Sequence, residues 1–260
     1  MNISELYIHP LKSAAAKSVE ELSYTRVGPA YDRQWMVVDD SGKFMSQRSE
    51  PIMCKITADI DIGTLVLSAP GMDILAVPKM SSARSVKVWG DDVLANDCGE
   101  QAAQWLSEYL GKSCRLVELS EDTERAVDLD YANNGETVSF ADGFPTLIVS
   151  QASLDEFNTH LDVPVDMRRF RPNIVIDGCL PYAEDAWEKI RINDIEFSLV
   201  KPCSRCIMPS INPDTAVKEL NVNDVLLKTR RKDRKTFFGQ NALHRGVGTV
   251  RVGDKVELIR

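Results

Sequence analysis

Two cysteines three positions apart are the residues of this chain best suited to chemistry. Cys203 and Cys206 lie in segment 201–210, which reads Lys-Pro-Cys-Ser-Arg-Cys-Ile-Met-Pro-Ser and follows a predicted strand. A thiolate is a soft ligand that selects soft or polarisable metal centres, and the neighbouring Lys201 and Arg205 favour the thiolate over the thiol. The motif therefore predicts that one cysteine of the pair binds a metal, but it does not name the metal.

Other interpretations of the pair remain open on the motif alone. A zinc site needs about four ligands, and the chain offers one CxxC motif and three histidines. A thioredoxin-like redox pair opens a helix, whereas Ile207-Met208-Pro209 is a poor helix start. Two purely structural thiols fit better than either, because reduced cysteine is often a small buried apolar residue. The same structural interpretation applies to Cys54, Cys98, Cys114 and Cys179.

Three further side chains could move protons. Asp142 lies in the turn Ala141-Asp142-Gly143 before an apolar strand. It is either a turn residue or a group that orients substrate or relays a proton beside a metal. His9 and His244 have suitable chemistry, but isolated histidines are more often structural.

A run of positive charge stands near the carboxyl end of the chain. Six of the eight residues from Lys228 to Lys235 are Lys or Arg. The usual interpretation is a solvated loop, but a basic patch on an acidic protein can also steer an acidic partner. We therefore expect either a loop or a docking site for an electron-transfer protein.

The elements that must position these residues are mostly short strands. Alternation of polar and apolar residues, with turns between the runs, predicts strands and hairpins rather than helices. One helix is predicted at 100–110, ended by Gly111, and another after the N-cap Ser150, with Leu154, Phe157 and Leu161 on one face. Segment 118–134 is predicted as a loop between two halves. The predicted strands are 5–8, 33–38, 55–62 with 64–68, 85–89 with 93–95, 146–149, 173–176, 190–192 with 195–200, and a pair 248–252 with 255–259.

Length and charge exclude several classes of protein. The chain has 260 residues and a net charge of −8, which argues against nucleic-acid binding as its main task. No apolar run approaches the roughly 20 residues that span a bilayer, so no membrane partner is expected. The N-terminus does not look like a signal peptide, and we expect a cytoplasmic protein with reduced cysteines.

Six stretches in order resemble the MOSC family of molybdenum-cofactor proteins. This family includes eukaryotic amidoxime-reducing components and bacterial reductases of N-hydroxylated base analogues. Each motif is unspecific alone, but together the six cover nearly the whole chain. They are Tyr7–Ser13, Tyr31–Trp35, Ser139–Pro145, Phe170–Val175, Lys201–Cys206 followed by Pro213-Asp214-Thr215, and Phe238–Asn241.

The resemblance implies a cofactor and the residues that hold it. It implies that Cys206 is the thiolate ligand of molybdenum, and that Cys203 is a structural or supporting thiol. The cofactor, molybdopterin, carries a phosphate, which calls for fixed cations. Without the resemblance, Lys12 and Arg33 would be interpreted as surface charges and Arg171 as a structural ion-pair residue. The residues that stand where the family binds the cofactor are Lys12, Ser13, Arg33, Gly143, Arg171 and Asn173.

The resemblance also implies a fold and a reaction. The expected fold is mainly β with some helices (α+β), with an N-terminal β-barrel-like domain at 1–120 and a MOSC β-barrel domain at 121–260. The expected reaction is reduction of N–OH to N–H in a small molecule, with Cys206 and Asp142 as the catalytic residues. Since the chain lacks the cysteine array of an iron–sulfur domain, its electrons would come from a separate flavin or iron–sulfur protein. The rival is a non-catalytic carrier of the cofactor or of sulfur.

Overall fold

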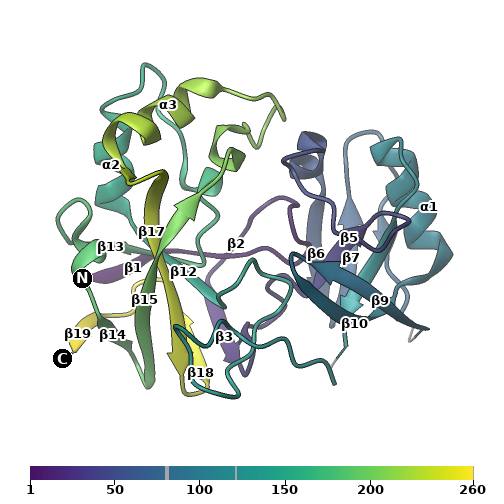
Figure 1. Cartoon of the computed structure of the whole chain (residues 1–260), viewed down its shortest axis with the longest axis horizontal. Helices are drawn as coiled ribbons and strands as arrows, with labels where there is room; N and C mark the ends of the chain where they lie inside the picture. The colour runs from purple at the N-terminus through teal and green to yellow at the C-terminus, as the bar shows by residue number, and fades with distance from the viewer. Residues whose placement is uncertain (80–81, 121, 260) are drawn as a thin grey trace.

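Two lobes lie side by side, and both chain termini belong to one of them (Figure 1). The computed structural model describes residues 1–79, 82–120 and 122–259. The lobe with the termini holds the largest sheet and the helices α2 (Gln151–Asn158) and α3 (Leu220–Thr229), whereas the other lobe holds α1 (Gly99–Leu110). The element order confirms the predicted fold class, which is mainly β with a few helices.

The largest sheet contains nine described strands, most of them from the second half of the chain. Its order is β19-β14-β15-β17-β12-β13-β1-β2, and β16 pairs with β17 outside this path. All these neighbours are antiparallel except β12 and β13, which are parallel. The strands are β1 (Asn2–Ile8), β2 (Lys17–Val19), β12 (Thr146–Ser150), β13 (Ile174–Asp177), β14 (Lys189–Ile192), β15 (Ile195–Arg205), β16 (Arg231–Lys232), β17 (Lys235–Arg245) and β19 (Val256–Ile259).

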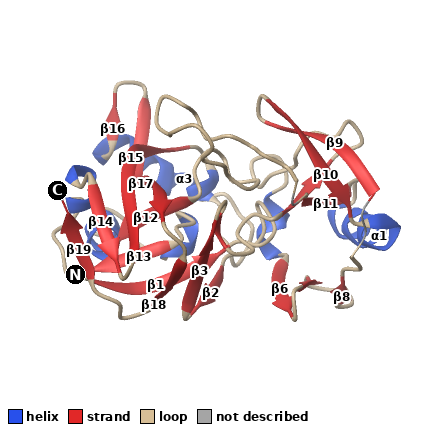
Figure 2. Ribbon diagram, turned by 90° about the horizontal axis from the view of Figure 1, so that it is seen from below, coloured by secondary structure: helices blue, strands red, loops and turns tan. Residues whose placement is uncertain are grey.

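Smaller sheets complete the molecule. The second lobe has a four-stranded sheet in the order β5-β11-β10-β9 and a three-stranded sheet β6-β7-β8, and a third small sheet has the order β18-β3-β4. Figure 2 shows the β9–β10 hairpin far from β14 and β19. The strands are β3 (Glu21–Thr25), β4 (Gly28–Pro29), β5 (Trp35–Val38), β6 (Thr57–Asp61), β7 (Thr64–Ser68), β8 (Leu75–Ala76), β9 (Ser82–Val88), β10 (Asp91–Asp97), β11 (Arg115–Leu119) and β18 (Gly248–Arg251).

The first strand of the chain belongs to the sheet of the second half. β1 pairs with β13 in the register Leu6↔Ile174, and apolar side chains of β1 and β3 pack in one core with β14, β15 and β17. The other lobe has its own core around Trp35, Met53 and Leu106. The predicted boundary at residue 120 stays a prediction, but residues on both sides of it contribute to the core of the large sheet.

Both predicted helices are present; α1 ends and α2 begins where the sequence predicts, but α2 ends before the predicted Leu161. Gly111 follows α1 with a left-handed φ of 65°, and the Ser150 hydroxyl caps α2 by accepting a hydrogen bond from the Ser153 N–H. Leu161 lies beyond the end of α2. Among the described residues, no helix has the length and apolar character needed to cross a bilayer. The 3₁₀ turns are η1 (Pro51–Lys55), η2 (Met167–Arg169), η3 (Ala183–Ala186) and η4 (Met208–Ser210).

Two expectations about the end of the chain are wrong. The strands predicted at 248–252 and 255–259 exist as β18 and β19, but they do not pair with each other. β18 pairs with β3 and β19 pairs with β14, because each strand fills the edge of a different sheet. The basic run 228–235 is not a loop: it is the end of α3, followed by a hairpin of β16 and β17.

Segment 120–134 agrees with the predicted loop. Its described residues form no helix and no strand of a sheet, and Ala126 makes only an isolated bridge to Thr137. Glu118 and Leu119, which the loop was predicted to include, belong to β11. The segment therefore links the four-stranded sheet to the loop that carries Asp142.

Candidate functional site

All eight residues predicted for the site line one cavity. The cavity lies where segments of both lobes meet and contains about 820 Å³ of space, including its open mouth. The predicted residues that line it are Lys12, Ser13, Arg33, Asp142, Gly143, Arg171, Asn173 and Cys206.

Strand β15 delivers the cysteine pair to this cavity. Cys203 lies near the end of β15, and Cys206 follows the last residue of the strand, so the motif does not open a helix. Cys206 is exposed, Cys203 is half-buried, and both thiols are free. Arg205 donates a hydrogen bond to the Cys203 Sγ at 3.1 Å and another to the Phe170 carbonyl at 2.8 Å. Cys203 is therefore held in place by the protein, whereas Cys206 is open to a ligand.

Lys12 and Asp142 form an ion pair on one wall of the cavity. The buried Lys12 Nζ donates to Asp142 Oδ1 at 2.5 Å and to the Phe140 carbonyl at 2.7 Å. The Trp89 Nε1 donates to the same Asp142 oxygen at 3.2 Å. The side chain of Asp142 is 62% exposed, against 6% for Lys12. Asp142 can thus meet a bound molecule while Lys12 fixes it from behind.

The pair sets the charge of both groups. Burial lowers the pKa of Lys12, and the Asp142 carboxylate opposes that shift. Desolvation raises the pKa of Asp142, but the charge and hydrogen bond of Lys12 outweigh it and hold that pKa well below its usual range. Asp142 is therefore ionised at neutral pH, which suits a hydrogen-bond acceptor better than a proton donor.

Arg33 joins three parts of the site through its guanidinium group. It donates to Asp32 Oδ2 at 2.5 Å, to Asn173 Oδ1 at 3.2 Å and to the Arg171 carbonyl at 3.1 Å. Asn173 also bonds the backbone of Tyr7 and Leu147. The side-chain amide of Asn173 therefore makes its hydrogen bonds to other parts of the protein, and one of them positions Arg33.

Three site residues adopt a left-handed backbone although none is glycine. Ser13, Arg33 and Arg171 have φ values of 66°, 48° and 56°. Such conformations are costly and persist where surrounding structure enforces them, often at functional sites. Their occurrence around one cavity indicates that the backbone is held in a shape that serves the cavity.

The cavity holds more positive than negative charge. Among the described residues that line it, the cations are Lys12, Arg33, Arg48, Arg171 and Arg205, and Asp142 is the carboxylate. Burial, then repulsion from Arg33, lowers the pKa of Arg171, and the buried Nε of Arg205 has no hydrogen-bond partner. Because unpaired buried cations are costly, this lining fits an anionic group such as a phosphate, next to a soft thiolate.

Some residues of the cavity were missed by sequence reasoning. Phe44, Arg48 and Met208 line it, and the Arg48 guanidinium lies 4.7 Å from the ring centre of Trp89 and 5.6 Å from that of Phe44. Segment 44–48 has no clear periodicity and belongs to none of the six motifs. The one available signal was an arginine four positions after a phenylalanine, a pattern that is common on any surface.

Neither histidine considered for proton transfer is among the residues lining the cavity. His9 is fully buried, with Nε2 3.1 Å from the Pro172 carbonyl, and burial lowers its pKa well below the ordinary value. His244 Nε2 lies 2.7 Å from the Thr25 carbonyl. Within residues 1–79, 82–120 and 122–259, no three His, Cys, Asp or Glu side chains gather as a zinc site requires.

Two family models match most of the chain. Residues 1–113 match the family described as MOSC N-terminal beta barrel domain, and residues 135–257 match the MOSC domain family. The solution structure of a Bordetella bronchiseptica protein is 28% identical, covers 38% of this chain and 89% of its own, and has a TM-score of 0.33. That structural match is too partial to support an argument.

Curated relatives extend over almost the whole chain. Mitochondrial amidoxime-reducing component 1 is 34% identical in Mus musculus and 34% in Homo sapiens, and mitochondrial amidoxime reducing component 2 of Bos taurus is 32% identical. The alignments cover 98–99% of this chain and 82% of each relative. The chain therefore belongs to the family of MOSC proteins that includes the amidoxime-reducing components.

Proposed function

We propose that this protein is a molybdenum-cofactor-dependent reductase that converts N–OH to N–H in N-hydroxylated small molecules. The observation that supports it most is the exposed Cys206 beside a cavity lined by five cations. A soft thiolate suits molybdenum, and the cations suit the phosphate of molybdopterin. The relatives are named for the reduction of amidoximes, which contain an N–OH group.

The proposed roles follow from chemistry and position. Cys206 is the thiolate ligand of the metal, and Lys12, Ser13, Arg33, Gly143, Arg171 and Asn173 form or position the cofactor cradle. When bound, the cofactor supplies the electron-transfer and oxygen-accepting chemistry that no side chain here provides. The reaction consumes two electrons and two protons, and yields the N–H product and water.

Asp142 is the proposed residue on the substrate side. As a carboxylate at the cavity mouth it would accept a hydrogen bond from the substrate and orient the N–OH group. Lys12, paired to it at 2.5 Å and with its pKa lowered mainly by burial, is the better proton source of the two. The pair would thus position the substrate and supply a proton from one place.

Electrons would come from a separate flavin or iron–sulfur protein. The described residues that line the cavity include a single CxxC pair, which cannot by itself hold an iron–sulfur cluster with four cysteine ligands. A cytoplasmic location remains a prediction from the sequence, and the relatives named above are mitochondrial.

A turnover assay tests this proposal. Protein produced in a host that makes molybdenum cofactor is supplied with dithionite and an aryl amidoxime, and formation of the amidine is measured. We expect turnover in the parent and none in Cys206→Ser. The exposure of Cys206 would also suit a carrier that hands the cofactor on. A carrier would bind cofactor, release it to an acceptor protein and show no turnover, and that result would overturn the reductase proposal.

A further inference from the structure

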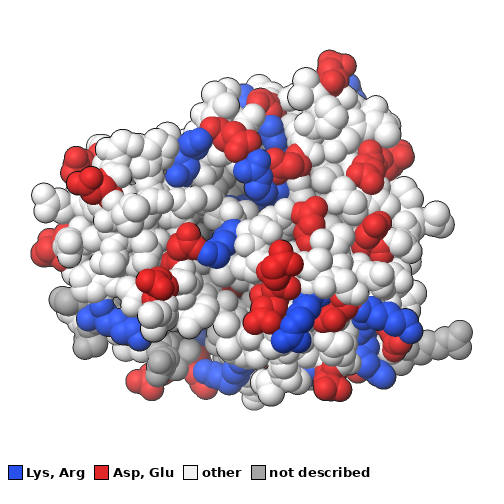
Figure 3. All heavy atoms as spheres, turned by 180° about the vertical axis from the view of Figure 1, so that it is seen from behind, with Lys and Arg blue, Asp and Glu red and all other residues white. Residues whose placement is uncertain are grey.

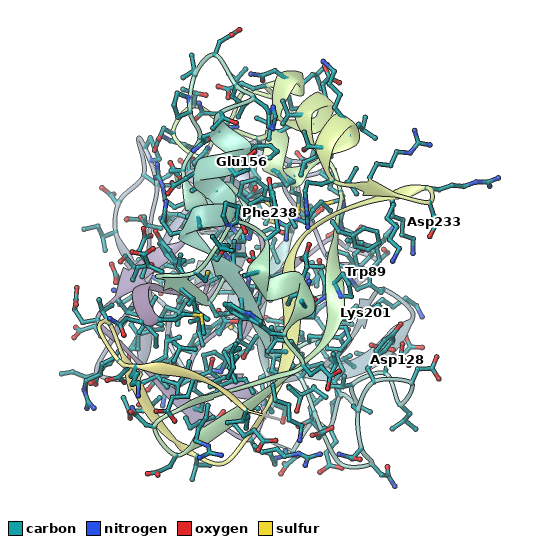
Figure 4. The ribbon with its side chains drawn as sticks, turned by 90° about the vertical axis from the view of Figure 1, so that its left-hand side faces the viewer. Trp89, Asp128, Glu156, Lys201, Asp233 and Phe238 are labelled. Atoms are coloured by element: carbon teal, nitrogen blue, oxygen red, sulfur yellow. The ribbon has the colours of Figure 1, made fainter. Side chains whose placement is uncertain are left out.

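The hairpin at residues 231–235, here called the basic hairpin, projects from the body of the protein. It is formed by β16, a turn and the start of β17, and it exposes Arg231, Lys232, Arg234 and Lys235 around a single acid, Asp233. Figure 4 shows Asp233 at the protruding tip, on the side of the molecule where Trp89 and Lys201 also lie. Figure 2 shows the turn after β16 projecting on the same side as β9 and β10.

The charges of the basic hairpin are not neutralised within the protein. Among the described residues, none of its four cations forms an ion pair with a carboxylate. The preceding residue is different, since Arg230 pairs with Asp185 at 2.5 Å and covers the ring of Tyr182 at 3.9 Å. Arg230 is thus part of the fold, whereas the cations beyond it are available to a partner.

The basic hairpin is connected directly to the segment that carries Cys206. In the sheet, Arg231 pairs with Thr236 and Thr236 pairs with Arg205, the residue before Cys206. Two strand spacings place the backbone of Arg231 about 10 Å from that of Arg205. The Thr236 hydroxyl also donates to the Arg205 carbonyl at 3.3 Å. A partner seated on the hairpin would therefore rest beside the proposed metal ligand.

Helix α3 connects the other side of the same segment to the hairpin. The N–H of Glu219, the N-cap of α3, donates to the Ser210 carbonyl at 2.7 Å. The helix exposes Leu220 and Leu227 by 60% and 44%, and their spacing of seven residues puts them on one face. Residues 219–237 thus join an apolar surface to a cationic tip. Hydrogen bonds tie one end of this unit to Ser210 and the other end to Arg205, on the two sides of Cys206.

We propose that residues 219–237 form the docking surface for a small acidic redox protein that delivers electrons to the site beside Cys206. This inference rests on the proposed reductase function. The hairpin is convex, so it suits the surface of a macromolecule better than a small ligand. An apolar patch with a charged rim is the usual anatomy of a transient interface, and opposite charge guides the encounter.

The remaining surface would help to orient such a partner. The protein carries a net charge of −8, so an acidic protein is repelled by most of it and attracted to the hairpin. The face opposite the hairpin mixes acidic and basic side chains without a continuous field of either sign (Figure 3). An anionic membrane would also attract the hairpin, but it would not need the strand pairing that brings the hairpin to Cys206.

The experiment uses charge reversal at the tip and a matched reversal elsewhere. The test variant is Lys232→Glu/Arg234→Glu, and the control is Arg191→Glu/Arg245→Glu. The control changes the same number of exposed charges on β14 and at the far end of β17. The probes are a reduced flavodoxin and a reduced plant-type ferredoxin, both strongly acidic. Amide chemical shifts of the labelled protein report binding, with or without cofactor, and reoxidation of the probe reports electron transfer to the loaded protein.

We expect binding and electron transfer to depend on the hairpin and on salt. In the parent at low salt, the probe should change the amide chemical shifts of residues 219–237 and should be oxidised quickly. Both the binding affinity and the oxidation rate should fall about tenfold when salt is raised to about 0.3 M. In the test variant, binding should be weak and probe oxidation slow even at low salt, and neither should change when salt is raised. The control variant should behave like the parent. Amidoxime reduction with dithionite should be equal in all three proteins.

Several results would overturn the docking surface. It fails if both probes bind elsewhere or not at all, if the two variants behave alike, or if vesicles containing anionic lipid compete with the probes for the hairpin. Absence of dithionite-driven turnover in the parent would instead overturn the reductase proposal. The chemical shifts would still decide the docking question in that case.

Discussion

The ion pair of Lys12 and Asp142 determines which group near the cavity mouth can donate a proton. Asp142 is exposed, but the ammonium group behind it keeps it ionised. Lys12 is buried, and the carboxylate offsets part of the cost of its charge. A single substitution at Asp142 therefore changes both groups, which makes the pair testable through pH dependence.

Asp142→Asn should lower kcat/KM for an amidoxime by about 10²-fold, the usual scale of a lost acid–base or orienting group. Bound molybdenum should not change. Loss of the carboxylate removes the charge that raises the pKa of Lys12, so the alkaline limb of the pH–rate profile should move to lower pH. The control is Asp92→Asn, an exposed acid paired with Lys87. An unchanged profile in Asp142→Asn would show that the pair does not supply the proton.

Sequence motifs predicted eight residues that line one cavity, but not the interactions between them. The eight predicted residues come from five of the six motifs, and fixed motif order is enough to place them in one cavity once the family is recognised. Arg48 and Phe44 were not predictable, because their place depends on how one lobe packs against the other. The hydrogen bond from Arg33 to Asn173 likewise depends on two segments, 140 positions apart in the sequence, that meet in the fold.

At the scale of elements, Asp97 ties two strands to a helix. It accepts hydrogen bonds from Arg115 at 2.6 and 2.8 Å, from Arg84 at 2.7 Å and from the Gly99 N–H at the start of α1 at 2.8 Å. Burial raises the pKa of this carboxyl, but these donors outweigh it and lower the pKa from 3.8 to about 2. The carboxylate therefore stabilises the fold only while it is ionised.

Asp97→Asn should lower the free energy of unfolding by about 2 kcal/mol at pH 7, the equivalent of that difference in pKa. A depressed folded-state pKa gives stability that is complete above pH 3.8 and is lost as pH falls through about 2. The gap between parent and variant in urea unfolding should therefore narrow below about pH 4. A gap that stays constant down to pH 2 would mean that the charge of Asp97 contributes nothing.

Local patterns predicted elements better than their pairing. α1 and α2 have a stop or a cap in the sequence. Helix α3 begins at Leu220, after Glu219, whose side chain makes no cap, and this helix was not predicted. Its buried Val222, Val225 and Leu226 were a usable signal. The pairing of β18 with β3 joins residues more than 200 positions apart, and no local pattern carries that information.

At the scale of the whole molecule, the two halves of the chain share the large sheet. Leu6, Ile8, Leu22 and Tyr24 pack in the core formed by β13, β14, β15 and β17. Because β1 covers the edge of β13, the second half alone would expose an apolar face and an unpaired strand.

A fragment of residues 121–260 should therefore fail to fold alone. We expect a collapsed or aggregated state with poor dispersion of its amide resonances and no cooperative thermal transition. Adding residues 1–30 as a separate chain should restore part of the native spectrum, since these contain β1, β2, β3 and β4. A fragment that unfolds cooperatively without them would show that the β1 contacts are not needed for this half.

The most direct test is the molybdenum and pterin content of three purified proteins, made side by side in a host that synthesises the cofactor. We predict about one metal and one pterin per chain in the parent, as expected for a single thiolate-ligated centre. Cys206→Ser should lose the metal. Cys203→Ser should keep most of it, because the Cys203 sulfur accepts a hydrogen bond from Arg205 and is not the proposed ligand. Equal molybdenum in all three proteins, or none in the parent, would contradict Cys206 as the ligand.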